Sequence, residues 1–226
     1  MELPKQKSEI VSALDKQTIL IYGRAKIGKS TLASQFPSPL FLATEAGLNH
    51  LSVHKTNITS WLSFLEACVE IQKGNHEFKT IVIDTIDNLV SLCSDYICKR
   101  EKIDHPADMP MGKGWYLITE ELKGKLIKLS MLPYGLVFIS HCKNEVVKTR
   151  TAEYNRYTIS ISGTGSRRVF LNMSDLILFV DSKIESNKER RIIYTKPSRD
   201  YEAGDRTGLL PETLELNYDA LIKYFK

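Results

Sequence analysis

A short segment near the start of the chain limits the possible folds more than any other feature. Residues 23–31 read Gly-Arg-Ala-Lys-Ile-Gly-Lys-Ser-Thr, a complete match to the phosphate-binding loop G-x-x-x-x-G-K-[ST], and the apolar residues 18–22 come directly before them. Such a loop joins a buried strand to a helix, and its backbone amides surround a β-phosphate. A chance glycine turn before a helix is the alternative. Because strand, loop and a short apolar helix at 30–36 follow in the required order, we predict a nucleotide-binding loop.

The residues of this loop have separate expected roles. Gly23 and Gly28 permit a tight turn and leave the amides accessible to a phosphate. Lys29 is expected to reach the β- and γ-phosphates, Ser30 to coordinate Mg²⁺, and Thr31 to face the α-phosphate. The predicted nucleotide-binding set is Gly23, Arg24, Ala25, Lys26, Ile27, Gly28, Lys29, Ser30 and Thr31, together with Asp84.

A second motif supplies the expected metal ligand. Residues 80–84, Thr-Ile-Val-Ile-Asp, have the Walker B pattern of an apolar strand that ends in a carboxylate. In P-loop proteins this Asp holds Mg²⁺ together with the hydroxyl of the loop. The alternative is a core strand that is simply closed by an Asp. With the phosphate-binding loop present, we predict ATP and Mg²⁺ as cofactors, with Ser30 and Asp84 at the metal.

Catalysis needs a group that orients the attacking water. Many ATPases with this loop carry a Glu directly after the Walker B Asp, but this chain has Thr85 there. Glu45 is the best candidate base because it follows the apolar residues 40–44, and parallel strands end in one row beside the ligand. It could instead cap a helix near Ala46. His141 follows residues 135–140 and could hydrogen-bond the γ-phosphate or the water, although a lone His is more often structural.

Apolar runs alternate with helical patterns along most of the chain. Strand-length runs occur at 18–22, 40–44, 80–84, 135–140, 176–181 and 191–195, and helical spacing occurs at 61–72, 86–97 and 117–132. Alternation of this kind predicts an α/β fold with a mostly parallel sheet flanked by helices. We expect a single domain over residues 1–226, with an N-terminal extension at 1–17 and a final helix at 218–225.

Two segments depart from this alternation. Residues 146–150 and 157–161 predict a protruding β-hairpin with its tip at 151–156, within a basic region that covers 143–168. Residues 196–211 form a charged loop after the last strand. The formal net charge of +4 is modest, but basic residues concentrate at 143–168 and 183–206. Such clusters are usually solvated faces, and they are also the footprint expected of a polyanion site.

Cysteine usage and hydropathy narrow the class further. The four cysteines, Cys68, Cys93, Cys98 and Cys142, contain no C-x-x-C pair, so buried thiols are favoured over disulfides or zinc. His105 near Cys93 and Cys98 fits no zinc spacing. No apolar stretch approaches the length needed to cross a bilayer, and the N-terminus lacks a signal-peptide pattern. We therefore expect a cytoplasmic protein without a membrane partner.

These motifs together resemble the RecA-like recombinase core. Residues 40–46 are similar to the RecA strand that ends in a catalytic glutamate, and residues 137–141 are similar to the strand that ends in a nucleotide-sensing glutamine, here His141. Residues 163–168 fall where that family has its second DNA-binding loop. Combined with the segments 196–198 and 204–206, the pattern resembles the short RecA-like P-loop ATPases encoded by phages, a group that includes single-strand annealing proteins. The resemblance covers residues 18–211.

The resemblance implies partners and further site residues. A DNA-binding member needs cations for the backbone and flat rings for stacking on bases. The corresponding residues here are Lys143, Lys148, Arg150, Tyr154, Arg156, Tyr157, Arg167 and Arg168. RecA-like subunits also place cations on the phosphates bound by a neighbour, and the candidates for this trans contact are Lys196, Arg199 and Arg206. Within the loop these cations could instead pair with Asp200, Glu202 and Asp205.

The expected function is that of a Mg-ATP-dependent ATPase that binds single-stranded DNA. It would act in recombination by annealing or pairing strands in a phage-infected bacterial cell, as a ring or filament of identical subunits, with a single-strand DNA-binding protein as a further candidate partner. Two alternatives come from other classes. One is a small-molecule kinase, with the hairpin as a lid, and the other is a regulatory or scaffold ATPase that binds an acidic protein.

Overall fold

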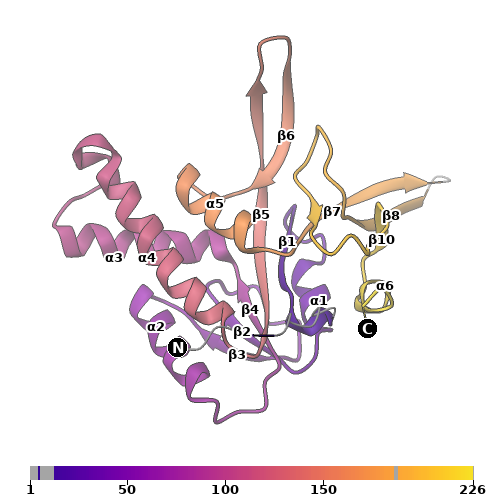
Figure 1. Ribbon diagram of the computed structural model, residues 1–226, viewed down its shortest axis with the longest axis horizontal. Helices are drawn as coiled ribbons and strands as arrows, with labels where there is room; N and C mark the ends of the chain where they lie inside the picture. Colours follow the sequence, from indigo (N-terminus) through magenta and orange to yellow (C-terminus); the bar gives the residue numbers. More distant parts are fainter. Residues whose placement is uncertain (1–4, 6–12, 186–187, 226) are drawn as a thin grey trace.

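The computed structural model describes residue 5, residues 13–185 and residues 188–225. These residues form helices on both faces of one large, mostly parallel sheet (Figure 1). Most of the predicted N-terminal extension lies outside the described residues, apart from a 3-10 turn at Leu14–Lys16. Within the described part of the chain, no helix has the length and apolar character that a membrane span requires.

The sheet has the strand order β10-β8-β7-β1-β5-β4-β2-β3. From β7 to β3 neighbouring strands are parallel, whereas β8 and β10 are antiparallel to their neighbours. The strands are β1 (Thr18–Gly23), β2 (Pro39–Ala43), β3 (His54–Asn57), β4 (Thr80–Asp84), β5 (Gly135–Lys148), β6 (Glu153–Ile159), β7 (Leu176–Glu185), β8 (Lys188–Tyr194), β9 (Gly204–Asp205) and β10 (Thr213–Glu215). Every strand predicted from an apolar run is present, which confirms the α/β class with a mostly parallel sheet flanked by helices.

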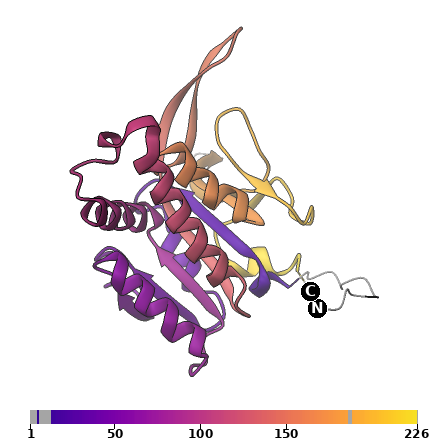
Figure 2. The same cartoon turned by 60° about the vertical axis from the view of Figure 1, so that its left-hand side comes forward.

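Helices cover the two faces unequally. The helices are α1 (Lys29–Ala33), α2 (Trp61–Lys73), α3 (Ile86–Glu101), α4 (Lys113–Ser130), α5 (Thr164–Met173) and α6 (Tyr218–Ile222). Helices α2 to α5 pack on one face, which Figure 2 brings forward, and α1 and α6 pack on the other. The first turn of α4 lies directly against the segment that precedes the helix, because a Cβ on Gly114 would lie 2.2 Å from the carbonyl oxygen of Pro106.

The central strands are buried on both sides, so their side chains alternate between two cores. In β1, Leu20 and Tyr22 join the core beneath α2 to α5, while Ile19 and Ile21 join the core beneath α1 and α6. All six residues of β1 are buried. Continuous apolar runs rather than polar and apolar alternation are the pattern of strands covered on both faces. This burial fixes the register that brings the carboxyl ends of β1, β2, β4 and β5 together.

The predicted β-hairpin exists, but its tip was placed wrongly. β5 continues from the sheet as one arm, β6 is the other, and the hairpin projects from the top of the molecule in Figure 1. The tip is residues 149–152 instead of 151–156, because Lys148 pairs with Glu153 both in register and as an ion pair of 3.3 Å. Thr149 closes the turn by hydrogen bonds to Ala152.

A second ribbon leaves the same edge of the sheet. β7 extends beyond the end of β1 and pairs with β8 from Phe179 to Glu185. Because β1 lies between β5 and β7 in the sheet, the loop that follows β1 sits in a fork between the two ribbons. In Figure 1 one ribbon points upward and the other points to the right. The fork therefore places the predicted phosphate-binding loop beside two projecting antiparallel pairs.

Candidate functional site

The phosphate-binding loop has the backbone that its sequence requires. Gly28 has φ 111°, a left-handed value that favours glycine, and α1 begins immediately after it at Lys29. Gly23 is needed for a different reason from the one expected. A Cβ there would lie 2.2 Å from the carbonyl oxygen of Val180, so only glycine allows β1 to lie against β7 at this point. The N-terminus of α1 consequently opens onto the carboxyl edge of the sheet.

Lys29 is a buried ammonium whose hydrogen bonds go to the loop itself. Its Nζ donates to the carbonyl oxygen of Gly23 at 3.0 Å and to that of Arg24 at 2.8 Å, and the residue is 5% exposed. Burial lowers its pKa from the ordinary lysine value, and the nearby Asp84 carboxylate opposes that shift. A buried cation without an ion pair among the described residues is suited to an incoming phosphate.

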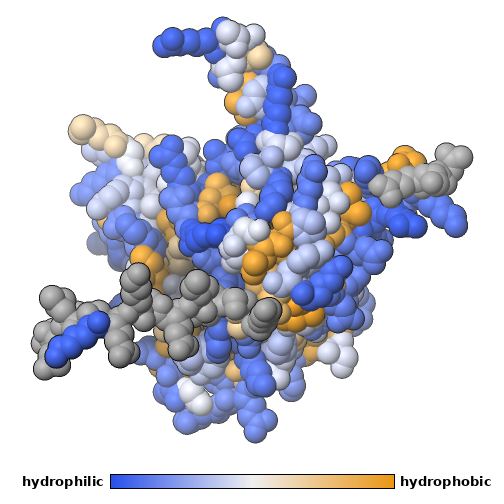
Figure 3. Space-filling view, turned by 45° about the vertical axis from the view of Figure 1, so that its right-hand side comes forward, coloured by the Kyte–Doolittle hydropathy of each residue, from blue (hydrophilic) through white to orange (hydrophobic). Residues whose placement is uncertain are grey.

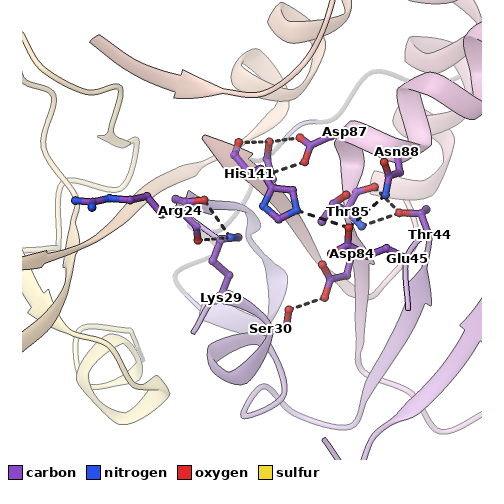
Figure 4. Close-up of polar contacts among 12 residues, drawn as sticks. Arg24, Lys29, Ser30, Thr44, Glu45, Asp84, Thr85, Asp87, Asn88 and His141 are labelled. Carbon is purple, nitrogen blue, oxygen red and sulfur yellow. Dashed lines mark hydrogen bonds and ion pairs between the residues drawn. The ribbon is translucent and has the colours of Figure 1, made fainter. Parts of the chain in front are cut away.

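Ser30 and Asp84 meet as the metal prediction requires. The Ser30 hydroxyl donates to Oδ2 of Asp84 at 2.7 Å, and Asp84 is 3% exposed (Figure 4). Burial raises the pKa of Asp84, and the bond from Ser30 opposes the increase. A hydroxyl and a carboxylate side by side form the all-oxygen set that Mg²⁺ prefers beside phosphates. The residues present thus fit Mg²⁺, and the metal role stays a prediction.

Glu45 faces the same space from the end of β2. Its Oε2 accepts a hydrogen bond from Nδ2 of Asn88 at 3.3 Å and lies 3.6 Å from Nε2 of His141. No helix begins after it, since residues 46–51 form bends and turns and residues 52–53 lead into β3. The helix-capping alternative is therefore not supported. Glu45 and His141 are both about one-third exposed, which leaves them able to contact a ligand or a water.

Asp87 is a site residue that the sequence did not reveal. It is a carboxylate in the first turn of α3, and it accepts hydrogen bonds from the Ser140 hydroxyl and, at 2.9 Å, from the backbone amide of His141. Burial raises the pKa of Asp87, and these two bonds oppose the shift. Asp87 thereby fixes the point where β5 leaves the sheet. The sequence offered one signal, an acid at a helix start.

Thr44 and Thr85 lock the ends of β2 and β4 together. The Thr44 hydroxyl accepts from the Thr85 amide at 2.8 Å and donates to the Thr85 carbonyl oxygen at 2.9 Å. This reciprocal pair sits directly between Glu45 and Asp84 in the row of strand ends. The residue that replaces the usual Glu after the Walker B Asp thus has a structural role.

These side chains surround one cavity at the carboxyl edge of the sheet. Its volume is about 650 Å³, and Lys29, Ser30, Thr31, Glu45, Asp84 and His141 line it. An adjoining cavity of about 730 Å³ lies between α1, β8 and β10 and is lined partly by apolar side chains of Leu32, Leu214 and Leu216. On the face of the molecule that carries β8 and β10, apolar side chains gather among charged ones (Figure 3). Arg191 lines both cavities, and sequence reasoning assigned it no role.

The predicted DNA-binding cations differ in their availability. Arg150, at the hairpin tip, and Arg168, on α5, are exposed. Lys148 is 75% exposed although it pairs with Glu153. Arg167, 20% exposed, pairs with Glu145 at 2.7 Å. The remaining two, Lys143 and Arg156, face inward: Lys143 donates to the carbonyl oxygen of Ile161, and the Nε of Arg156 is buried.

The two predicted stacking rings are engaged within the chain. Tyr157 stacks on Phe179 with centroids 5.6 Å apart, at the foot of the hairpin. The ring of Tyr154 has the guanidinium of Arg199 over it at 4.3 Å. Tyr157 therefore belongs to an internal aromatic cluster, whereas Tyr154 has one face covered. Stacking of these rings on bases stays a prediction, and the structure favours Tyr154 over Tyr157 for it.

The three cations proposed for a trans contact also have partners in their own chain. Lys196 pairs with Asp205 at 3.3 Å, as the alternative interpretation anticipated. Arg206 pairs with Asp175 at 2.6 Å, at the amino ends of β1 and β7 and so opposite the phosphate-binding loop. Arg199 covers Tyr154. A trans contact would require each of them to exchange an existing partner.

A known protein family matches the part of the chain that carries these site residues. The AAA domain family AAA_24 matches residues 15–207, which include the loop, the Walker B strand, Glu45 and His141. The chain belongs to this family. AAA-domain proteins of this family are P-loop ATPases, and the cavity around Lys29 contains the residues predicted to bind the nucleotide.

Proteins similar to this AAA-domain protein include a prophage-derived bacterial protein and an archaeal protein of solved structure. The SPbeta prophage-derived uncharacterized protein YorG of Bacillus subtilis (strain 168) is 24% identical over 197 residues, which are 83% of this chain and 57% of YorG. The chain thus spans little more than half the length of that curated relative. Among solved structures, the KaiC-like protein PH0186 from Pyrococcus horikoshii OT3 is similar with a TM-score of 0.44 and 12% identity, over 84% of this chain and 81% of that one.

Proposed function

We propose that this P-loop ATPase binds single-stranded DNA under the control of Mg-ATP and acts in phage recombination by annealing or pairing strands. The prophage origin of the relative YorG supports the phage assignment. The DNA assignment depends on the hairpin, whose exposed cations are Lys148 and Arg150, together with Arg168 on the neighbouring α5. Exposed cations on a projecting ribbon suit a flexible polyanion more than a compact substrate.

One observation carries the proposal. β5 is a single strand that runs from the buried sheet through His141 into the hairpin without a break. The imidazole of His141 lies 3.6 Å from the Glu45 carboxylate in the cavity around Lys29. The backbone amide of His141 donates a hydrogen bond to Asp87. A change at the γ-phosphate position that moves His141 would therefore move the hairpin arm. Coupling of this kind needs a continuous rigid element, which β5 provides.

The site residues divide the chemical work between them. Lys29 would exchange its two carbonyl partners for phosphate oxygens, and Ser30 and Asp84 would hold Mg²⁺, which neutralises charge on the phosphates. Glu45 would orient a water and accept its proton late in the reaction, because it is a carboxylate at the cavity wall that is about one-third exposed. Asn88 and His141 would keep that carboxylate aimed into the cavity.

Contacts at the foot of the hairpin support a second route of coupling. Tyr22, the residue before the phosphate-binding loop, donates to the carbonyl oxygens of Glu202 and Tyr157 and accepts from the Glu202 amide at 2.9 Å. The Thr158 hydroxyl donates to the Glu202 carboxylate at 2.5 Å. The charged loop thus ties β1 to β6. Nucleotide-dependent movement of the loop after β1 would reach both arms of the hairpin.

Assembly is part of the same proposal. Identical subunits would form a ring or filament around the strand, and Lys196, Arg199 or Arg206 would reach a neighbour's phosphates after leaving their partners. A single-strand DNA-binding protein would present the DNA. The protein would work in the cytoplasm of the infected cell.

The hairpin assignment is tested by fluorescence anisotropy of a labelled oligo-dT with the triple variant Lys148→Ala, Arg150→Ala, Arg168→Ala. Removal of three phosphate contacts should weaken binding and lower the salt slope by about 2, because each contact releases about 0.7 counterion on a single strand. The matched control removes Lys55, Lys123 and Lys128, which are exposed on β3 and α4. It changes the net charge equally and should leave the slope unchanged.

Other outcomes would select the alternatives. Equal loss in both triple variants would mean that only the net charge matters, which contradicts a hairpin site. Retention of an acidic protein but not of oligo-dT would favour the scaffold ATPase. Phosphate release only in the presence of a small phosphoacceptor would favour the kinase.

A further inference from the structure

Arg191 lies against the phosphate-binding loop of its own chain. It belongs to β8 and pairs in register with Ser182 of β7. Strand side chains alternate between faces, so Arg191 points to the same side as Ile193, which is buried in the core beneath α1. A Cβ built on Gly28 would lie 3.5 Å from Nη1 of Arg191. The guanidinium therefore lies close to Gly28 of the loop.

Arg191 also lies where three cavities meet. It lines the cavity of Lys29, Ser30 and Asp84, the adjoining cavity beside Thr31 and Leu32, and a smaller one of about 410 Å³ that opens along residues 24–27. Residues of the phosphate-binding loop line all three cavities, so the junction adjoins the loop. No other arginine of the described chain lines all three.

The charge of Arg191 is not neutralised by a neighbour. Among the described residues it forms no ion pair, whereas Arg24 on the other side of the loop pairs with Asp181 at 2.8 Å. The acid nearest along the strand on the same face is Glu189, which lines two of the three cavities. An unpaired guanidinium offers a planar fork of donors that matches two phosphate oxygens.

We propose that Arg191 binds the phosphate chain of the nucleotide held by the same subunit and thereby links the β7–β8 ribbon to nucleotide binding. This inference rests on the proposed function in that it requires a nucleotide in the loop. The inference goes beyond the proposed function because it adds Arg191 as a cation that acts on the nucleotide of its own subunit, in contrast to the three candidates for a trans contact. Binding would draw the ribbon onto α1, because Arg191 is fixed in β8 by its pairing with β7.

Equilibrium binding of a fluorescent ATP analogue with Mg²⁺ tests the contact. Arg191→Ala should weaken affinity about 10- to 100-fold, the range for a lost charge-assisted hydrogen bond. Arg191→Lys keeps the charge and loses the fork, so its affinity should be intermediate. Lys188→Ala is the matched control, since it removes one cation from the same strand outside all three cavities, and it should bind like the parent.

A mixing experiment separates cis from trans action. At a low ATP concentration, mixing Arg191→Ala with Lys29→Ala should give no more ATP hydrolysis than the Arg191→Ala subunits give alone, at any ratio, because each site needs both residues from one chain. Recovery in the mixture would overturn the cis assignment, and parent-like affinity of Arg191→Ala would overturn the contact. Failure of the parent to bind the analogue is a different result, which would contradict the proposed function itself. Because Arg191 is exposed, its substitution should leave thermal unfolding without nucleotide unchanged.

Discussion

At the scale of single residues, the site holds two buried groups of opposite charge that do not pair directly. Lys29 donates to loop carbonyls, and Asp84 accepts from Ser30. Burial disfavours the charged form of each, since it lowers the pKa of Lys29 and raises that of Asp84. A phosphate and a divalent cation would relieve both penalties. The desolvation already present in the free protein is thus a source of affinity for Mg-ATP.

The raised pKa of Asp84 gives a pH prediction. Mg²⁺ competes with a proton for this carboxylate, so apparent Mg²⁺ affinity should fall as the solution is acidified, and the fall should begin at a higher pH than for an exposed Asp. Without metal the sign reverses, because a raised native pKa makes the folded state more stable as pH falls through it. Titration of Mg²⁺ against bound nucleotide measures the effect. Asp84→Asn should lower Mg²⁺ affinity and flatten its pH dependence, and an unchanged dependence would contradict metal binding by Asp84.

Glu45→Gln tests the assignment of the base. The amide cannot accept the proton of the water, so the rate of ATP hydrolysis should fall by about 10²- to 10⁴-fold, whereas ATP affinity should stay near that of the parent. Single-turnover hydrolysis and equilibrium binding measure the two quantities separately. Glu66→Gln, on α2 outside the nucleotide cavity, is the control. Hydrolysis at the parent rate in Glu45→Gln would remove Glu45 from the mechanism.

At the scale of secondary-structure elements, one side-chain hydroxyl ties β1 to β6 and to the charged loop. Tyr22→Phe removes the hydroxyl that donates to the Glu202 carbonyl oxygen, and it leaves the Glu202 amide with only its 3.3 Å bond to the Tyr157 carbonyl oxygen, in a site where Tyr22 is fully buried. The free energy of unfolding should fall by about 1–3 kcal/mol, the cost of unsatisfied buried polar groups. Urea denaturation measures it. Tyr116→Phe, at an exposed ring on α4, should be neutral, and equal stability of both variants would contradict the role of Tyr22.

Some elements could be predicted from sequence and others could not. The strands around β1 are buried on both faces, so each appears in the sequence as a continuous apolar run that can be recognised. The predicted strand at residues 80–84 matches the observed bounds of β4, Thr80–Asp84. β3 was missed because all four of its residues are exposed at the sheet edge. The hairpin tip was misplaced because polar residues fill both arms and no Asn-Gly or Asp-Gly pair marks the turn.

The residues of the site also divide into those that the sequence predicted and those that it did not. Motif residues such as Lys29, Ser30 and Asp84 were identified because fixed spacing on a loop and a strand dictates their meeting. Asp87 and Arg191 were not identified as site residues, because their approach to it depends on strand register and helix placement rather than on local sequence. The pairing of Arg206 with Asp175 was not anticipated either, because the two residues are 31 positions apart and no local pattern encodes their contact.

At the scale of the whole molecule, the arrangement of the sheet explains how one bound nucleotide could act on two projections. The phosphate-binding loop follows the strand that lies between β5 and β7, and both of these strands continue outward as ribbons (Figure 1). His141 connects the site to the first ribbon, and Arg191 connects the second ribbon to the loop. A nucleotide in the fork would therefore contact the base of each.

The most direct test of this account is ATP hydrolysis with Mg²⁺, measured with and without single-stranded DNA, on the parent and on Lys29→Ala. We predict hydrolysis by the parent that DNA stimulates, and no hydrolysis above background by Lys29→Ala under either condition. Stimulation by DNA would show that the nucleotide site and the hairpin communicate. A parent that neither binds nor hydrolyses Mg-ATP, or a Lys29→Ala variant as active as the parent, would contradict the central claim.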